Sequence, residues 1–234
     1  MITKIKENLI FDNAFAKIFN DEVAFTNGVT GTHLRVIPSS RCCVIVIPVM
    51  VDGTISMIEN YRYALGGLVT EFPQGGVDTN ESLSVAAHRE LLEETGLVCQ
   101  RLSYAGRLFS SPSILAGETN IFIAWGCSPS AELVKGDEFE AIKSVKSHSI
   151  LEVSDIILND EYIVDTSTVG AFHYLYSYLP DELKCRVESF AFLMGAYCNR
   201  RGINSMGNPF RNDLLSSKES SDWEAGWRFA QNQH

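Results

Sequence analysis

Residues 75–97 read GGVDTNESLSVAAHRELLEETGL, and this stretch decides the fold. Asn80 is a suitable N-cap and Gly96 a suitable C-terminal stop, so the residues between them are predicted to form one helix. At 100° per residue, small apolar side chains in the first half share a face with three glutamates in the second half. That face consists of Leu83, Ala86, Ala87, Glu90, Glu93 and Glu94. Because alanines favour close packing against a sheet, the carboxylates are predicted to point inward.

Three inward carboxylates at the end of a helix need cations. They lie at the negative end of the helix dipole, where each acid is disfavoured by about 0.3–1 kcal/mol. Arg89, one turn before Glu93, neutralises only part of this charge. Hard divalent ions with oxygen ligands supply the remainder, with Mg²⁺ as the first candidate and Mn²⁺ as the second. A merely solvated acidic face is the alternative, but the apolar register of the same face argues against it.

The same residues carry a family resemblance. They fit the pattern G-x5-E-x7-R-E-U-x-E-E-x-G-U, where U is aliphatic. The fixed positions are Gly75, Glu81, Arg89, Glu90, Leu91, Glu93, Glu94, Gly96 and Leu97. The chain therefore resembles a Nudix hydrolase, an enzyme that cuts a nucleoside diphosphate joined to another group. The resemblance covers about residues 8–180 and implies an α/β (α+β) fold, a Nudix α/β/α sandwich with mixed sheets.

Strand and turn signals divide the chain into three units. An N-terminal β meander is expected over residues 1–40, a Nudix domain over 41–180 and a helical C-terminal appendage over 181–234. Within the meander, strands 9–18, 22–26 and 33–37 are separated by turns at Asn20-Asp21 and Asn27-Gly28. Further strands are expected at 42–51, 55–63, 102–109, 121–127 and 139–145, with helices at 150–158 and 168–179.

Composition favours a cytoplasmic enzyme that is not bound to a membrane. The 234 residues are 45% hydrophobic, enough for one ample core. The first residues lack the features of a signal peptide, and the longest apolar run, residues 42–51, is too short to cross a bilayer. The six cysteines include no C-x-x-C pair. Reduced thiols are therefore predicted rather than a zinc site or disulfides.

The charge distribution separates the appendage from the rest. Residues 180–234 contain seven Lys or Arg and seven Asp or Glu, so the net charge of −10 belongs to residues 1–179. An acidic protein that acts on an anionic diphosphate must supply local cations, and duplex nucleic acid is a poor substrate for it.

We call the pattern over residues 75–97 the box. Residues outside the box indicate a subfamily. Residues 60–67 read NYRYALGG and residues 71–78 read EFPQGGVD, which resemble the approach to the box in ADP-ribose pyrophosphatases. Pro112 lies fifteen residues past Leu97, a spacing associated with that subfamily. The resemblance implies metal-dependent cleavage of ADP-ribose to AMP and ribose 5-phosphate, with the meander used for homodimerisation and adenine binding. Other nucleoside diphosphate sugars such as GDP-mannose are the rival substrates, and an ADP-ribose sensor is the rival class.

The resemblance implies roles for the box residues. Glu90 and Glu94 would ligate metal together with the backbone carbonyl of Gln74. Glu93 lies close by, and Arg89 would orient a carboxylate.

Substrate contacts are implied for four further residues. Arg62 matches an arginine that grips phosphates or the terminal ribose, with a plain surface arginine as the alternative. Glu71 and Glu118 would also contact the substrate, and Arg35 is a second phosphate candidate. Residues 111–118, SPSILAGE, depart from the family turn by one extra residue and lack its early glycine.

Hydrolysis also needs a base that deprotonates an in-line water. Residues 135–140, KGDEFE, match the acidic D-E-x-E loop that carries the base in this family. The match implies Glu138 as the base, with Glu140 able to join the metal cluster. The alternative is a charged hairpin tip.

The appendage carries a second, looser resemblance. Apolar residues recur at helical spacing over 181–199, and Trp223 and Trp227 lie one helical turn apart. Together with Asn208, Gly226 and Ala230 they resemble the ribosome modulation factor, which implies contact with the ribosome or RNA. The favoured alternative is a helical hairpin whose tryptophans pack the appendage onto itself or a partner subunit.

Overall fold

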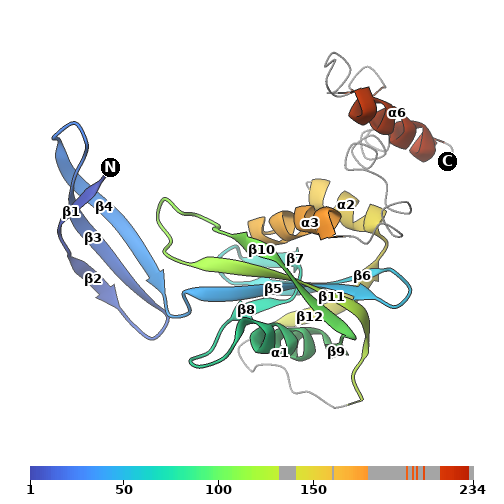
Figure 1. Ribbon diagram of the computed structural model, residues 1–234, viewed down its shortest axis with the longest axis horizontal. Coiled ribbons are helices and arrows are strands. Elements are labelled where there is room, and N and C mark those ends of the chain that lie inside the picture. Colours follow the sequence, from blue (N-terminus) through green and yellow to red (C-terminus); the bar gives the residue numbers. More distant parts are fainter. Residues whose placement is uncertain are drawn as a thin grey trace.

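The computed structural model describes residues 1–131, 141–159, 161–178, 199, 202, 204, 208 and 217–231. A small sheet stands to one side of a larger sheet that forms the centre of the molecule (Figure 1). The small sheet contains β1 (Thr3–Lys6), β2 (Leu9–Asp12), β3 (Ala16–Ala24) and β4 (Thr30–Pro38). β1 and β2 pair with successive parts of β3 on one side, and β4 pairs with β3 on the other. The expected meander is therefore present, but the single strand expected over residues 9–18 is wrong, because the chain turns between β2 and β3, where the N–H of Asn13 donates to the carbonyl of Ala16 at 3.1 Å.

The central sheet is mixed, as the resemblance implied. It contains β5 (Cys42–Met50), β6 (Ile55–Arg62), β7 (Gly67–Glu71), β8 (Gln74–Gly76), β9 (Leu97–Val98), β10 (Arg101–Leu108), β11 (Glu118–Pro129) and β12 (Ile142–His148). Its main path runs β10-β11-β5-β6-β12, while β7, β8 and β9 pair with β6, β5 and β11. β11 and β5 are parallel, and the remaining pairs are antiparallel.

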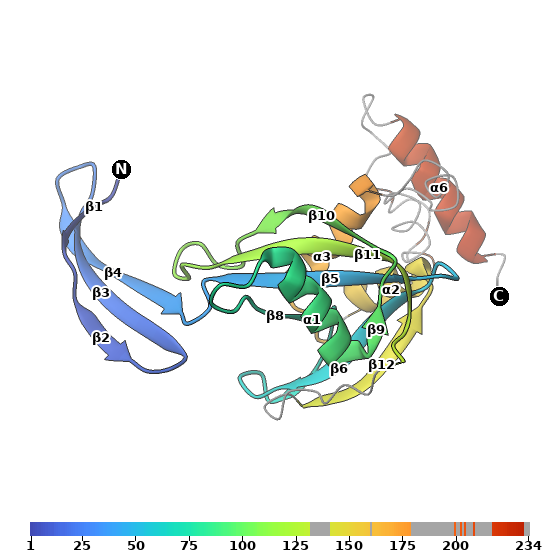
Figure 2. The same cartoon turned by 60° about the horizontal axis from the view of Figure 1, so that its bottom comes forward.

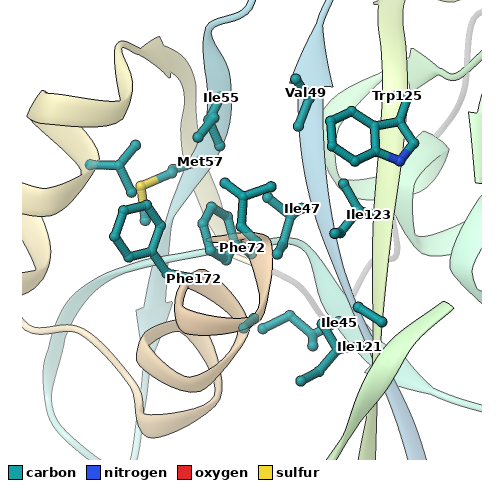
Figure 3. Packing of buried hydrophobic residues seen from close by; sticks show 14 of the residues in the cluster. Ile45, Ile47, Val49, Ile55, Met57, Phe72, Ile121, Ile123, Trp125 and Phe172 are labelled. Carbon is teal, nitrogen blue, oxygen red and sulfur yellow. The ribbon is translucent and has the colours of Figure 1, made fainter. Parts of the chain in front are cut away.

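Helices cover both faces of the central sheet (Figure 2). α1 (Leu83–Thr95) packs on one face, and α2 (Ile150–Leu158) and α3 (Thr166–Tyr178) pack on the other. Alternate residues of β5 serve the two faces, since Ile45 and Ile47 pack toward α3 whereas Val44 and Val46 pack toward α1. Figure 3 shows the first of these clusters, in which Phe172 from α3 meets the sheet. The α/β/α sandwich is confirmed.

A loop joins the small sheet to the central body. The main chain of Val36 in β4 donates to the carbonyl of Ile114 and accepts from the N–H of Ala116, both at 2.8 Å. The loop after β10 therefore contacts β4 through backbone hydrogen bonds, at a place separate from the chain connection at residues 39–41.

Two further local predictions in the first half of the chain were wrong. β3 runs straight through Asn20-Asp21, because the buried carboxylate of Asp21 is paired with Arg35 at 2.9 Å. Ser82, not Asn80, caps α1, and its side chain accepts from the N–H of Val85 at 3.3 Å. The residue expected as the cap has a φ of +69° and forms part of the preceding turn.

Two turn predictions were confirmed. Gly28 has a φ of +80° in the β3–β4 connection. Gly96 has a φ of +69°, and its N–H donates to the carbonyl of Leu92 at 2.8 Å, which ends α1.

The described part of the appendage contains α6 (Ser217–Gln231). Trp223 in α6 is fully buried and Trp227 is half-buried. The side chain of Asn208 donates to the carbonyl and hydroxyl of Ser220 at 3.2 and 3.1 Å. The helix expected over 181–199 lies outside the described residues, except for position 199. None of the described helices has the length and apolarity needed to cross a bilayer.

Candidate active site

The loop before α1 approaches the helix so closely that it requires glycine. In β8, Gly75 pairs with Val44 of β5, which places the loop against the helix. A Cβ added to Gly75 would lie 2.2 Å from Oε1 of Glu90, well inside van der Waals contact. Glu90 is 5% exposed and Glu94 is 3% exposed. Of the three carboxylates predicted to point inward, Glu90 and Glu94 do so, whereas the prediction was wrong for Glu93, whose side chain is 33% exposed.

Arg89 organises the carboxylates of α1. Nε and Nη2 donate to the two oxygens of Glu81, both at 2.9 Å, and Nη2 also donates to the carbonyl of Gly76 at 2.8 Å. Nη1 donates to Glu90 at 2.7 Å and to Glu93 at 3.0 Å. These bonds use all five N–H groups of the guanidinium. They raise the pKa of Arg89, chiefly through Glu81, and they lower the pKa of Glu81.

Gln74 links the loop to the last turn of α1. Its backbone N–H donates to Oε2 of Glu94 at 2.7 Å. The structure thus brings Glu90, Glu94 and the main chain of Gln74 together, while Glu93 lies nearer the surface.

A cavity of about 480 Å³ opens beside this cluster and contains Arg62 and Glu71. Glu71 is 1% exposed and accepts from Arg62 at 2.7 and 3.2 Å and from Asn60 at 3.2 Å. Burial raises the pKa of Glu71 by more than these hydrogen bonds lower it. The side chain of Arg62 remains 41% exposed, so part of its guanidinium is accessible from solvent.

Asp165 also lines the cavity, and sequence reasoning did not identify it. It lies directly before α3, and its oxygens accept from the N–H groups of Ser167 and Thr168 at 3.3 and 3.0 Å. The signal that could have found it is an aspartate followed by small polar residues at the start of a predicted helix.

The donor set around the cavity suits a hard divalent cation. Arg62 is the one Lys or Arg among the described residues that line the cavity, and it is already paired with Glu71. Glu90 and Glu94 add buried carboxylate oxygens of the kind that Mg²⁺ and Mn²⁺ prefer. Within the described ranges no three His, Cys, Asp or Glu side chains already converge on one point. In this arrangement the guanidinium of Arg89 bridges Glu90 and Glu93.

The structure does not bring two of the expected substrate contacts to this cavity. Arg35 lies in β4, where its guanidinium pairs with Glu7 and Asp21 at 2.9 Å and stacks over Phe19 at 4.3 Å. Glu118 begins β11, and accepts from Arg107 at 3.1 Å and from Asn120 at 3.4 Å.

Glu118 and Arg35 are both absent from the described residues that line the cavity. Glu138 and Glu140 lie outside the described residues, because the described chain stops at residue 131 and resumes at 141.

Comparisons with known proteins agree with this geometry. The family model of the NUDIX domain matches residues 40–165. A methanol dehydrogenase activator from Bacillus methanolicus is 30% identical over 171 residues, which cover 73% of this chain and 90% of that protein. The ADP compounds hydrolase NudE of Escherichia coli K12 is 32% identical over 125 residues, covering 53% of this chain and 66% of that protein.

Two further comparisons extend these matches. An ADP-ribose pyrophosphatase from Bacillus subtilis is 26% identical over 171 residues, covering 73% of this chain and 90% of that protein. The crystal structure of an ADP compounds hydrolase shares the fold with a TM-score of 0.69 at 24% identity, over 78% of this chain and 96% of that one. With its box intact and Glu90 and Glu94 buried against the loop at Gln74 and Gly75, the chain belongs to the Nudix family and is a pyrophosphohydrolase.

Proposed function

We propose that the protein cleaves the diphosphate of ADP-ribose to AMP and ribose 5-phosphate, or that of a related nucleoside diphosphate sugar to its nucleoside monophosphate and sugar phosphate, in a reaction that depends on Mg²⁺. The observation that carries this proposal is the cavity lined by Arg62, Glu71 and Gln74, because the loop at Gln74 and Gly75 packs directly against Glu94 and Glu90 of α1. The relatives named ADP compounds hydrolase and ADP-ribose pyrophosphatase support the substrate class.

Each group in the site has a distinct task under this proposal. Glu90, Glu94 and the main-chain oxygen of Gln74 would hold Mg²⁺, or Mn²⁺, which supplies positive charge at the phosphoryl oxygens and lowers the pKa of water. Arg62 binds a phosphate through the accessible side of its guanidinium, while Glu71 fixes the other side. Water attacks phosphorus in line, and a nearby carboxylate accepts its proton.

We propose Glu138 as that base and Glu140 as a further metal ligand. Glu93 is the described carboxylate best placed to compete for the first role, because it lies beside Glu90 and its side chain is one-third exposed. The variants Glu138→Gln, Glu140→Gln and Glu93→Gln should be compared by kcat at saturating Mg²⁺. Loss of two or more orders of magnitude in Glu138→Gln alone supports the assignment. An equal loss in Glu93→Gln overturns it.

The deciding experiment measures hydrolysis with Mg²⁺ and with Mn²⁺ across ADP-ribose, GDP-mannose, UDP-glucose, NADH and diadenosine polyphosphates. The Glu93→Gln/Glu94→Gln double variant serves as the blank. Highest kcat/KM for ADP-ribose, lost in the blank, supports the proposal. Preference for another sugar nucleotide corrects the substrate. Calorimetric binding of ADP-ribose without turnover of any compound supports the sensor instead.

We also propose a division into three units and a homodimer, and the exposed surface of the small sheet supports the dimer. Residues 1–40 form one unit, 41–180 a second and 181–234 a third, and the first is proposed to join two copies into a homodimer. Large apolar side chains are exposed on the small sheet, among them Ile5, Leu9, Ile10, Phe11 and Leu34. A patch of this kind is typical of a protein interface.

The appendage is proposed to pack rather than to contact the ribosome or RNA. The full burial of Trp223 supports this choice, because an RNA-stacking tryptophan must be accessible. A chain ending at residue 180 tests it. Retained activity with loss of ribosome co-sedimentation would favour the RNA alternative, whereas loss of stability would favour packing.

The proposed location is the cytoplasm. Cys42, Cys43, Cys99 and Cys127 are all free thiols, which fits a reducing compartment.

A further inference from the structure

Residues at and just before the start of α3 form hydrogen bonds with every second residue of the segment between β7 and β8. Residues 163–168 accept three hydrogen bonds from residues 70–74, which carry the chain from β7 to β8. The three bonds run from Thr70 N–H to the Ile163 carbonyl at 2.9 Å, from Phe72 N–H to the Thr168 hydroxyl at 3.1 Å, and from the Gln74 side-chain amide to the Asp165 carboxylate at 3.2 Å. The loop is therefore positioned from outside the box helix.

Asp165 is the member of this set that combines two tasks. Its carboxylate caps α3 through Ser167 and Thr168, a task that any short polar acceptor can perform. Oδ2 also accepts from Nε2 of Gln74. A carboxylate can serve the cap and the amide together, because it accepts hydrogen bonds on both oxygens and donates none.

Gln74 carries the effect to the carboxylate cluster. Its Nε2 donates to Glu71 at 3.3 Å as well as to Asp165, so two acceptors fix the orientation of the side-chain amide. The backbone N–H of the same residue donates to Glu94 at 2.7 Å. The side chain and the main chain of Gln74 thus connect Asp165 and Glu71 to Glu94.

We propose that Asp165 is a positioning residue for the divalent cation, acting through Gln74. It touches neither the reacting phosphate nor the cation; it sets the place of the Gln74 main chain relative to Glu90 and Glu94. This inference rests on the metal dependence proposed above. Residues that orient metal ligands in this way change metal affinity or activity by about 10–100-fold when replaced.

The variant Asp165→Asn separates the two tasks. Asparagine caps helices as well as aspartate does, so α3 should keep its start. If its oxygen stays on the N–H of Thr168, the shorter of the two cap bonds, its amide NH₂ faces the NH₂ of Gln74. A flipped Gln74 amide would relieve that clash only by turning its oxygen toward the carboxylate of Glu71. With the cap kept, the link between Gln74 and residue 165 is therefore weakened in either orientation of the Gln74 amide.

The first measurement is Mn²⁺ binding to the substrate-free protein by calorimetry. We expect the Kd of Asp165→Asn to rise about tenfold. The Mg²⁺ concentration that gives half-maximal hydrolysis should rise by the same factor, with kcat at saturating Mg²⁺ within about twofold of wild type. A general loss of folded protein would lower kcat without this shift.

A second variant tests whether the effect passes through Gln74. Gln74→Leu keeps the main chain and removes the amide, so it should match Asp165→Asn, and the double variant should be no weaker than Gln74→Leu alone. Ser149→Ala is the matched control, because it removes the N-cap of α2 away from the cavity. Its melting temperature should fall while the Mn²⁺ Kd stays unchanged.

The proposal is overturned if the Mn²⁺ Kd is unchanged in Asp165→Asn, or if the effects on the Kd add up in the double variant. Asp165 would then act only as the cap of α3. Wild-type protein that binds Mn²⁺ but leaves ADP-ribose intact would remove the substrate proposal and keep this test valid. Wild-type protein that binds no Mn²⁺ would overturn both proposals together.

Discussion

Arg89 stabilises the box as much through its shape as through its charge. Its planar guanidinium donates hydrogen bonds to three carboxylates and one carbonyl at once. One of these carboxylates, that of Glu90, is nearly inaccessible to water. A lysine would keep the charge but could not span these acceptors. A positive charge without the guanidinium geometry is therefore not enough to hold these acceptors together.

Arg89→Lys should destabilise the fold by about 2 kcal/mol, because a buried charged acceptor loses its donor. For a chain of this length that corresponds to a melting temperature lower by roughly 4–8 °C. Differential scanning calorimetry without added metal measures it. Arg107→Lys is the control, since the pair with Glu118 is well exposed and worth little. Equal shifts in both variants would contradict the argument.

Acid sensitivity should follow from the carboxylates that Arg89 and the helix caps hold. Hydrogen bonds from Arg89 lower the pKa of Glu81, and those at the start of α2 lower that of Glu152. A lowered folded pKa contributes stability that is present above the unfolded value, about 4.3, and is lost as pH falls through the folded one. Burial raises the pKa of Glu71, so this group acts in the opposite direction.

The urea midpoint should therefore fall between about pH 5 and pH 3. Glu81→Gln should make the fall shallower, and Glu71→Gln should make it steeper. A wild-type midpoint that does not change over this range would contradict the assignment.

At the scale of elements, the contact between β8 and α1 is the tightest feature of the site. Gly75→Ala would push the carboxylate of Glu90 aside, because the added methyl group has no free space. We expect a destabilisation of about 1–3 kcal/mol and a loss of most Mn²⁺ affinity. Gly117→Ala is the control, since its Cβ would meet neighbours only at ordinary contact distance. Thermal unfolding and calorimetric titration measure both effects.

Helix α6 should depend on one tryptophan more than on the other. Trp223 is fully buried, whereas Trp227 is half-buried. Trp223→Ala should cost about 3–5 kcal/mol in the unit that contains it, and Trp227→Ala distinctly less. Limited proteolysis followed by mass spectrometry locates the new cleavage sites. Similar cleavage of both variants would mean that the burial of Trp223 contributes little.

The elements most fully predicted from sequence were those with strong periodicity. Helix α2 was predicted at its observed bounds, and α1 ended at Gly96 as expected, because apolar spacing and a left-handed glycine are local properties. Asp21 was missed as a strand residue, since its partner Arg35 is brought to it only by the pairing of β3 with β4. Asp165 was missed for the same reason. Its contact with Gln74 joins residues that are 91 positions apart.

At the scale of the whole molecule, the small sheet should determine the oligomeric state. Light scattering should give twice the chain mass of 26.0 kDa for the wild type. Phe11→Asp places a charge on the exposed edge strand β2 and should give the single-chain mass. Val51→Asp alters an exposed apolar side chain outside that sheet and should leave the dimer intact. A monomeric wild type would refute the dimer.

The backbone contact between Val36 and the loop after β10 gives the small sheet a second support. A body attached only through residues 39–41 could swing about them in any direction, whereas a second contact limits that motion to the axis through the two places. The loop that departs from the family turn is thus a brace, and Ile114 and Ala116 are its points of contact. A sheet restricted in this way would lose less orientational freedom on docking, so the second contact would lower the entropic cost of forming the proposed dimer.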